Sequence, residues 1–261
     1  MILAVANQKG GVCKTTIAAA LGAAAADAGV RVLLVDWDPQ ASLTTALGQP
    51  PQPGIYEAIR AWIDGEDTPA LPVRVLPGGE HLVPGHLDLA AAEVDLGHAE
   101  EREKVLRDLL EPVLHRYDLV IIDCGPTLGL LAVNAFVAAT HVLIPVTPEY
   151  LAAQGLVRLG QTLTRMRRRL NRDLQVLGVL PTMVKAGTRH HQEVMEQISL
   201  WSAREGIPML ATIPDTIKAA EAAGAGVALT RHPDRTRIVA AQVYHDLAQQ
   251  FIPHPEAVNR A

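Results

Sequence analysis

The sequence has little of what would define several other classes of protein. Its 261 residues include two cysteines, far apart and in no CxxC pair, so the chain carries neither a disulfide framework nor metal-ligand spacing. No apolar run reaches the roughly 18 residues needed to cross a bilayer, and the N-terminus lacks the basic region of a signal peptide. These absences predict a cytoplasmic protein.

Positive charge and aromatic rings are also scarce. The formal net charge is -5, so the protein as a whole is not a basic nucleic-acid binder, and any affinity for DNA has to come from a local patch. Aromatic residues make up 3% of the chain, and Ala, Val and Leu fill a hydrophobic share of 49%. This composition fits helices packed on a buried sheet better than a β-sandwich.

Apolar runs of strand length alternate with longer helical stretches along the chain. Runs without internal alternation are typical of strands buried on both faces, and together with the helices they predict a doubly wound α/β fold with a mostly parallel sheet. We expect one domain over residues 1–261, with about 252–261 as a flexible tail. The expected strands are 2–6, 30–35, 73–76, 81–83, 119–122, 142–146, 176–180 and 209–213. The expected helices are 15–28, 55–63, 100–115, 130–139, 152–170, 190–204 and 235–251.

A glycine-rich loop joins the first expected strand to the first expected helix, and it reads Lys9-Gly10-Gly11-Val12-Cys13-Lys14-Thr15-Thr16. Such a loop places backbone N–H groups around an anion at the positive end of a helix dipole. Lys14 adds a charge for the β- and γ-phosphates, and the Thr15 hydroxyl is placed to ligate Mg²⁺. The loop therefore predicts binding of ATP and Mg²⁺. It departs from the usual P-loop pattern at Gln8 and Cys13, where that pattern has glycine.

Two further segments bring carboxylates toward the same edge of the predicted sheet. Asp36 and Asp38 follow the second expected strand, and Asp123 follows the apolar run 119–122. Adjacent strand ends are where a carboxylate can orient water or Mg²⁺ against a γ-phosphate. Asp38-Pro39 alone would indicate an ordinary turn. Because a phosphate loop precedes it, the segment instead favours a role in nucleotide chemistry.

The lysine that opens the loop gives K-G-G-x-x-K-[ST], which resembles the deviant Walker A motif of the ParA/MinD group of P-loop ATPases. The D-W-D-P-Q segment at 36–40 resembles the D-x-D-P-Q of ParA-type proteins, and residues 117–123 resemble a Walker B strand. Cys124-Gly125-Pro126 resembles the second switch, with glycine in place of the usual first proline. Weaker similarities at 82–93, 144–156 and 213–222 extend the match to about residue 230.

This resemblance implies an ATP-dependent homodimer whose two subunits face each other across two ATP molecules. Lys9 would reach the partner subunit's nucleotide, Lys14 would bind the phosphates and Asp38 would serve hydrolysis. Mg²⁺ would be held by Thr15, Asp36 and Asp123. The residues expected to contact the nucleotide are Gly10, Gly11, Val12, Cys13, Lys14, Thr15, Thr16, Met183, Pro214 and Asp215.

Within this group the sequence favours the DNA-partition members. A membrane-bound member would need a basic amphipathic C-terminal helix, and residues 235–251 contain no lysine. An iron–sulfur member would need bridging cysteines. The resemblance then implies a nucleoid-associated ATPase that binds DNA without sequence preference and is stimulated by a ParB-like centromere-binding protein. Two alternatives stay open: a ParA-like positioning ATPase for a protein cargo, and a nucleotide-binding regulator in which Cys13 impairs hydrolysis.

Non-specific DNA binding requires a basic surface, because phosphate contacts supply the affinity. Arg189 and Lys218 lie where the family tends to carry DNA-contacting residues. An arginine run at 165–172 is predicted to share one helical face, which fits DNA contact and a solvated surface equally well. The full set of candidates is Arg165, Arg168, Arg169, Arg172, Lys185, Arg189, Lys218 and Arg231.

Cys13 stands at the start of a helix and beside Lys14. These neighbours predict a thiol with a lowered pKa and raised reactivity. We expect nucleotide binding to survive the missing glycine, although a Cβ restricts the backbone there. Alkylation of Cys13 would then block nucleotide binding, and Mg-ATP would protect the thiol.

Overall fold

A seven-stranded sheet organises the chain, in the order β3-β4-β2-β5-β1-β6-β7. The computed structural model describes residues 1–66, 69–150, 152–185 and 189–251, and within it every strand pair is parallel except β3 with β4. The predicted doubly wound, mostly parallel α/β fold is confirmed. The expected tail at 252–261 lies outside the described residues.

The strands and helices alternate much as the apolar runs predict. The strands are β1 (Ile2–Val5), β2 (Val32–Trp37), β3 (Arg74–Val75), β4 (His81–Val83), β5 (Leu119–Cys124), β6 (His141–Val146) and β7 (Gln175–Pro181). The α-helices are α1 (Lys14–Asp27), α2 (Ser42–Ala46), α3 (Ile55–Ile63), α4 (Leu89–Asp95), α5 (Val105–Leu110), α6 (Leu130–Ala138), α7 (Ala152–Arg169), α8 (Arg189–Glu205), α9 (Lys218–Gly224) and α10 (Val239–Phe251). Short 3₁₀ helices span Leu96–His98, Glu111–Arg116, Leu229–Arg231 and Arg235–Arg237.

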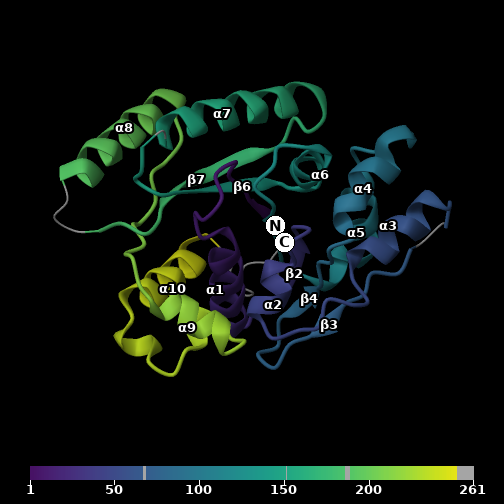
Figure 1. Cartoon of the computed structure of the whole chain (residues 1–261), viewed down its shortest axis with the longest axis horizontal. Coiled ribbons are helices and arrows are strands. Elements are labelled where there is room, and N and C mark those ends of the chain that lie inside the picture. Colours follow the sequence, from purple (N-terminus) through teal and green to yellow (C-terminus); the bar gives the residue numbers. More distant parts are fainter. Residues whose placement is uncertain (67–68, 151, 186–188, 252–261) are drawn as a thin grey trace, which may run out of the picture.

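Helices cover both faces of the sheet (Figure 1). On β5, Val120 and Ile122 point into the core beneath α3 to α8, while Leu119 and Ile121 point into the core shared with α1, α2, α9 and α10. Side chains alternate between the faces of a strand, so a strand that is apolar at every position has to be covered on both sides. The uninterrupted apolar runs of the sequence follow from this.

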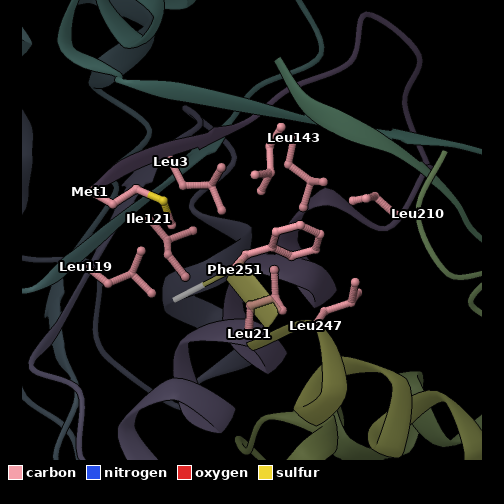
Figure 2. A pocket seen from close by; sticks show the side chains of 10 residues that line it. Met1, Leu3, Leu21, Leu119, Ile121, Leu143, Leu210, Leu247 and Phe251 are labelled. Atoms are coloured by element: carbon pink, nitrogen blue, oxygen red, sulfur yellow. The ribbon is translucent and has the colours of Figure 1, made fainter. Parts of the chain in front are cut away.

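The two edges of the sheet differ in chemistry. The carboxyl ends of the parallel strands meet at the edge where the phosphate loop lies, because β1 runs directly into that loop. The amino ends meet at an apolar pocket, which Figure 2 shows with the Phe251 ring from α10 reaching among leucine side chains. The residues that line this pocket are Met1, Leu3, Leu21, Leu119, Ile121, Leu143, Leu177, Leu210, Leu247 and Phe251.

Four expected elements are wrong in extent or type. The helix expected at 100–115 shrinks to α5, because residues 100–104 form turns and Pro112, which lacks an N–H, lies in a 3₁₀ segment. The strand expected at 209–213 is a single bridge from Met209 to Val179. The last helix begins at Val239 after a 3₁₀ turn. The second strand, expected at 30–35, is shifted by two residues to Val32–Trp37, so Asp36 lies inside it.

Helix α1 is buried along most of its length, as expected for an alanine-rich helix in the core. Small alanine side chains let it approach the sheet closely, and Gly22 allows the closest contact, because a Cβ there would lie 2.6 Å from a Leu34 methyl carbon. Within the described part of the chain, no helix combines the length and apolar character that crossing a membrane requires.

Candidate nucleotide-binding site

The phosphate loop connects β1 to the buried helix α1 with two residues in the left-handed region of backbone space. Gly11 has φ 73° and Cys13 has φ 64°. The first turn of α1 has no side-chain cap and no acidic residue, so its N–H groups are left for a ligand. A helix N-terminus in this condition, reached through a tight loop, is an anion site.

Two lysines of the loop occupy different environments. Lys14 is buried, and its ammonium reaches only the Lys9 carbonyl oxygen at 3.4 Å among the contacts found in the described residues. Burial lowers the pKa of Lys14, and the charges of Asp123 and Asp38 partly offset that effect. Lys9 lies at the rim, where its ammonium donates to Glu149 at 2.6 Å and to Thr147 at 3.3 Å. The Lys14 ammonium therefore lies within the loop, whereas the Lys9 ammonium is turned toward Glu149 at the rim.

Asp36 is held in the sheet by a chain of hydrogen bonds. Its Oδ2 accepts from the N–H and the hydroxyl of Thr44, at 2.8 and 2.6 Å, and Thr44 Oγ1 accepts from the Gly85 N–H at 2.9 Å. Gly85 has to be glycine, because a Cβ there would lie 2.7 Å from the Asp36 carboxyl carbon. The other oxygen, Oδ1, is buried and accepts no hydrogen bond from the described residues. Burial raises the pKa of Asp36 to about 6, against the opposing effect of Thr44.

Asp123 lies beside Asp36, in register with it on the neighbouring strand. Its carboxylate is completely buried and neither oxygen accepts a hydrogen bond in the described structure. Burial raises its pKa well above the usual value and the charge of Asp36 raises it further, while Thr15 and Lys14 oppose the shift. A buried carboxylate without partners is costly unless a cation or a ligand compensates it.

The three carboxylates fit a hydrated divalent cation. Asp38 is also largely buried, and its Oδ1 accepts from the Gln40 N–H at 3.0 Å, close to Gly125 of the second switch segment. Among the described residues, no three His, Cys, Asp or Glu side chains form a direct metal-ligand cluster. Mg²⁺ keeps several waters and is usually bound through one or two protein groups plus phosphate oxygens. Thr15, Asp36 and Asp123 are the residues that would hold it.

Comparisons with known proteins agree with this geometry. A family model described as an AAA domain matches residues 1–176. The sporulation initiation inhibitor protein Soj of Bacillus subtilis is 38% identical, over 95% of this chain and 97% of its own length. The chromosome-partitioning ATPase Soj of Thermus thermophilus is 39% identical, over 96% of this chain and 94% of its own length.

The chain belongs to the ParA-type partition ATPases of the ParA/MinD P-loop group. A solved structure agrees with the ParA-type fold: the protein named cobyrinic acid a,c-diamide synthase from Mycobacterium smegmatis, with a bound ATP analogue and magnesium, is 35% identical. It superposes with a TM-score of 0.80 and covers 95% of this chain and 92% of that one.

In this ParA-type chain, Met183, Pro214 and Asp215, which are expected to contact the nucleotide, lie on segments next to the phosphate loop, where the Thr182 hydroxyl donates to the Val12 carbonyl oxygen. Met183, with φ 54°, follows β7, and the next residue, Val184, forms a parallel bridge with Pro214. Asp215 is close enough to Cys13 to raise the pKa of its thiol, after burial, which is the larger cause. The expected lowering of the Cys13 pKa is therefore wrong, because desolvation and a nearby carboxylate outweigh the helix N-terminus and Lys14.

Five of the basic residues singled out in the sequence lie in environments of three kinds. Arg231 is a structural residue, because it donates to both oxygens of the buried Glu80 at 2.6 and 2.7 Å and to Asp27 at 2.9 Å; its contact with DNA stays a prediction. Arg172 lies beyond the end of α7 and does not share the predicted helical face. Lys185 and the two family positions carry ion pairs, namely Lys185 with Asp215, Arg189 with Glu193, and Lys218 with Glu221 and Asp234.

The residues that position Asp36, Lys9 and the phosphate loop are not among the predicted site residues. Thr44 is completely buried beneath Asp36, and its only sequence signal is a hydroxyl eight residues after a strand-end aspartate. Glu149 belongs to one of the matched segments, but its ion pair with Lys9 spans 140 positions and has no local signal. Asn7 likewise positions the loop, because its side chain donates to the Pro145 carbonyl and accepts from the Lys9 N–H.

Proposed function

We propose that this protein is an ATP-dependent DNA-segregation ATPase. Mg-ATP would join two copies face to face and enable binding to nucleoid DNA without sequence preference. Hydrolysis to ADP and phosphate, stimulated by a ParB-like centromere-binding protein, would release both. Relatives named for chromosome partitioning, matched over nearly their whole length, support the assignment.

One observation carries the chemical part of the proposal. The Asp123 carboxylate, completely buried with both oxygens lacking a hydrogen-bond partner among the described residues, lies within electrostatic reach of the loop lysine Lys14. A protein rarely keeps a buried carboxylate in this condition unless a ligand or cation completes its environment. A nucleotide phosphate would pair with the Lys14 ammonium, and the accompanying Mg²⁺ would compensate the Asp123 carboxylate.

The residues of the loop and the strand ends have separate roles in this proposal. Lys14 and the first-turn N–H groups of α1 would bind the phosphates, and Thr15, Asp36 and Asp123 would hold Mg²⁺, which neutralises phosphate charge when bound. Asp38 would accept a hydrogen bond from the attacking water and orient it toward the γ-phosphate. Met183, Pro214 and Asp215 would line the adenine side.

Lys9 connects the site to a second copy. Its ammonium at the rim is paired with Glu149, whose side chain is 57% exposed, so the pair is reachable by another molecule. In the proposed dimer, Lys9 would exchange this carboxylate for the partner subunit's phosphates. The exchange is electrostatically feasible because a half-exposed ion pair contributes little stability.

Cys13 favours a second candidate, a nucleotide-binding regulator with impaired hydrolysis. A residue with a Cβ holds the left-handed conformation that glycine adopts without strain. Turnover separates the two candidates. A segregation ATPase hydrolyses ATP when DNA and its partner are present, whereas the regulator binds nucleotide without turnover even then.

Dimerisation is tested by light scattering with and without Mg-ATP. The wild-type protein should double its mass with Mg-ATP. Lys9→Ala should bind a fluorescent ATP analogue normally and stay monomeric, and Lys14→Ala should lose nucleotide binding itself. A Lys9→Ala variant that dimerises like the wild type would remove the proposed role of Lys9 across the interface.

DNA binding is tested by co-sedimentation at several salt concentrations. Retention should require Mg-ATP and weaken steeply as salt rises, because counterion release drives phosphate contacts. Absence of retention with Mg-ATP at low salt would contradict the segregation function. Retention together with stimulation by a cargo complex, and not by a ParB-like protein, would instead favour a positioning ATPase.

A further inference from the structure

Helix α7 has an unusual charge distribution for an acidic protein. Its 18 residues, AAQGLVRLGQTLTRMRRR, include five arginines and no Asp or Glu, although the whole chain has more acidic than basic residues. All five are exposed, and we call four of them, Arg158, Arg165, Arg168 and Arg169, the α7 arginine stripe. The fifth, Arg167, donates to the Leu174 carbonyl oxygen and serves the turn after the helix.

Ion pairs among the described residues do not balance the positive charges of the stripe. In the part of the chain that the structure describes, none of its four arginines forms an ion pair with an acidic side chain. This contrasts with Arg189 and Lys218, which are paired with carboxylates.

The helix dipole does not account for the stripe either. Its stabilisation of cations falls off within the last turn of a helix, which covers Arg168 and Arg169. Arg165 is one turn further back, and Arg158 lies about three turns from the end of the helix at Arg169. Unpaired arginines along the middle of a helix repel one another unless an external polyanion neutralises them.

The shape around the stripe suits an extended anion. Arg165 lines a groove between α7 and α8 that also includes Gln161, Thr164 and the ion pair of Arg204 with Glu205. The two helices lie side by side over one end of the sheet (Figure 1). From Arg158 to Arg168 the stripe extends about 15 Å along the helix. That length spans several phosphates of a duplex, which carries one charge per 3.4 Å on each strand.

A membrane surface fits the helix less well. A helix that binds lipid uses charge together with an apolar face inserted among the acyl chains. The apolar face of α7, with Leu156, Leu159 and Leu163, is already buried against the sheet. The exposed face of α7 therefore offers arginine charges without an apolar surface that could insert among lipids. Contact through charge alone is how proteins bind nucleic acids without sequence preference.

We infer that the α7 arginine stripe contacts DNA phosphates, as a surface beyond the ion-paired residues Arg189 and Lys218. This rests on the proposed DNA-segregation function. One end of the stripe also reaches the nucleotide site, because Arg158 lines a hollow with Lys9 and Tyr150. The stripe therefore links the DNA surface to the rim where a second copy would bind.

The test compares variants that remove charge from different surfaces. Arg165→Gln/Arg168→Gln/Arg169→Gln leaves Arg158 at the nucleotide rim intact. Arg60→Gln/Arg102→Gln/Arg107→Gln removes the same net charge from arginines that are paired with acids, which controls for long-range electrostatics. A third variant, Arg189→Gln/Lys218→Gln, tests the rival surface. Each is assayed with Mg-ATP for dimerisation, for retention of duplex DNA and for binding to vesicles of phosphatidylglycerol and phosphatidylcholine.

We expect the α7 variant to dimerise normally but to retain DNA at least about tenfold less well. The slope of its salt dependence should fall by about 0.9 for each DNA phosphate that the stripe no longer neutralises. The Arg60/Arg102/Arg107 control should behave as the wild type. Arg165→Lys/Arg168→Lys/Arg169→Lys should recover most of the retention, which separates removal of charge from misfolding.

Two results would overturn the inference while leaving the segregation function standing. One is wild-type retention by the α7 variant with loss in Arg189→Gln/Lys218→Gln. The other is loss of vesicle binding in the α7 variant with DNA retention unchanged, which would assign the stripe to anionic lipid. A wild-type protein that dimerises with Mg-ATP but retains no DNA would overturn both the inference and the proposed function.

Discussion

Strand β5 carries an aspartate at each end, and the two are treated in opposite ways. Asp118, just before the strand, accepts from the N–H, Nε and Nη2 of Arg31, and these bonds hold its pKa below the usual range. Asp123, at the other end, is buried, and neither oxygen accepts a hydrogen bond from the described residues, and burial raises its pKa. One carboxylate stabilises the folded chain by itself, and the other is stable only with a ligand.

The same contrast extends to the two edges of the sheet. The amino edge beside Asp118 closes on the apolar pocket around Phe251 (Figure 2), where packing alone is sufficient. The carboxyl edge gathers a strained loop, a buried lysine and unsatisfied carboxylates. A protein tolerates such costs where function needs them and offsets them elsewhere in the fold. Substitutions at each edge distinguish residues that serve stability from residues that serve function.

The largest effect is expected from Asp123→Asn. Removing the charge should lower Mg-dependent ATP turnover about 10- to 100-fold, the usual loss for a group that holds a metal through water. The thermal midpoint of the nucleotide-free protein should stay unchanged or rise, because an uncompensated buried charge is gone. Steady-state kinetics measure the loss of ATP turnover, and thermal unfolding measures the change in the midpoint. A fall of several degrees in the midpoint would mean that Asp123 is structural.

A large effect is also expected in the pH dependence of stability. The pKa of Asp36 is about 6 in the folded state against an ordinary value of 3.8, so the folded state binds the proton more tightly. Its contribution is present below pH 4 and is lost as the pH rises through 6, by at most about 3 kcal/mol. Asp36→Asn should flatten that decline in thermal melts between pH 4 and 7. An unchanged slope would contradict the assignment.

Asp118→Asn should have the opposite pH signature and a smaller effect. Because the pKa of Asp118 is lowered, its stabilisation is present above the ordinary value of 3.8 and is lost as the pH falls. At neutral pH the substitution should lower the thermal midpoint by about 2–4 °C and leave nucleotide affinity unchanged. Thermal melts measure the midpoint, and binding of a fluorescent ATP analogue measures the affinity. Weakened nucleotide binding would show that Asp118 also supports the nucleotide site, against the proposed division between the two edges.

Cys13→Gly should stabilise the carboxyl edge slightly. Cys13 holds φ 64° and ψ 23°, a left-handed conformation that costs a residue with a Cβ about 1–2 kcal/mol. Part of that gain is offset by the greater freedom of glycine in the unfolded chain, which leaves about 0.5–1 kcal/mol. Denaturant unfolding of the nucleotide-free protein measures it. Cys13→Ala, which keeps a Cβ, is the matched control and should show no gain.

The smallest effect concerns the reactivity of Cys13. Burial and Asp215 raise the pKa of the thiol, so iodoacetamide should label it more slowly than free cysteine at a pH of about 7.5. Mg-ATP should slow labelling further by covering the loop. The Cys13→Ser variant controls for Cys124, which is buried. Equal labelling rates with and without Mg-ATP would place Cys13 outside the nucleotide contact.

Local patterns predict the elements that are set by local physics. The apolar runs locate β1, β4, β5, β6 and β7 to within two residues, since a strand buried on both faces has to be apolar throughout. The predicted 100–115 helix and 209–213 strand are wrong. Turns and a proline break the first, and the second meets β7 through one bridge and a few separate backbone hydrogen bonds, without a regular ladder. The loop at 9–16 and the aspartates can be identified, because parallel strands bring their carboxyl ends together.

The sequence by itself determined the fold class, the phosphate loop and the set of carboxylates, since each depends on residue types within one or two neighbouring elements. Only the tertiary structure decided their state. It raised the pKa values of Asp36 and Asp123 by burial, turned Lys9 to Glu149 and tied Arg231 to Glu80. Among the described residues it left the arginines of the α7 stripe without an ion pair. Burial and ion pairing depend on contacts between residues far apart in the chain, and no local pattern encodes them.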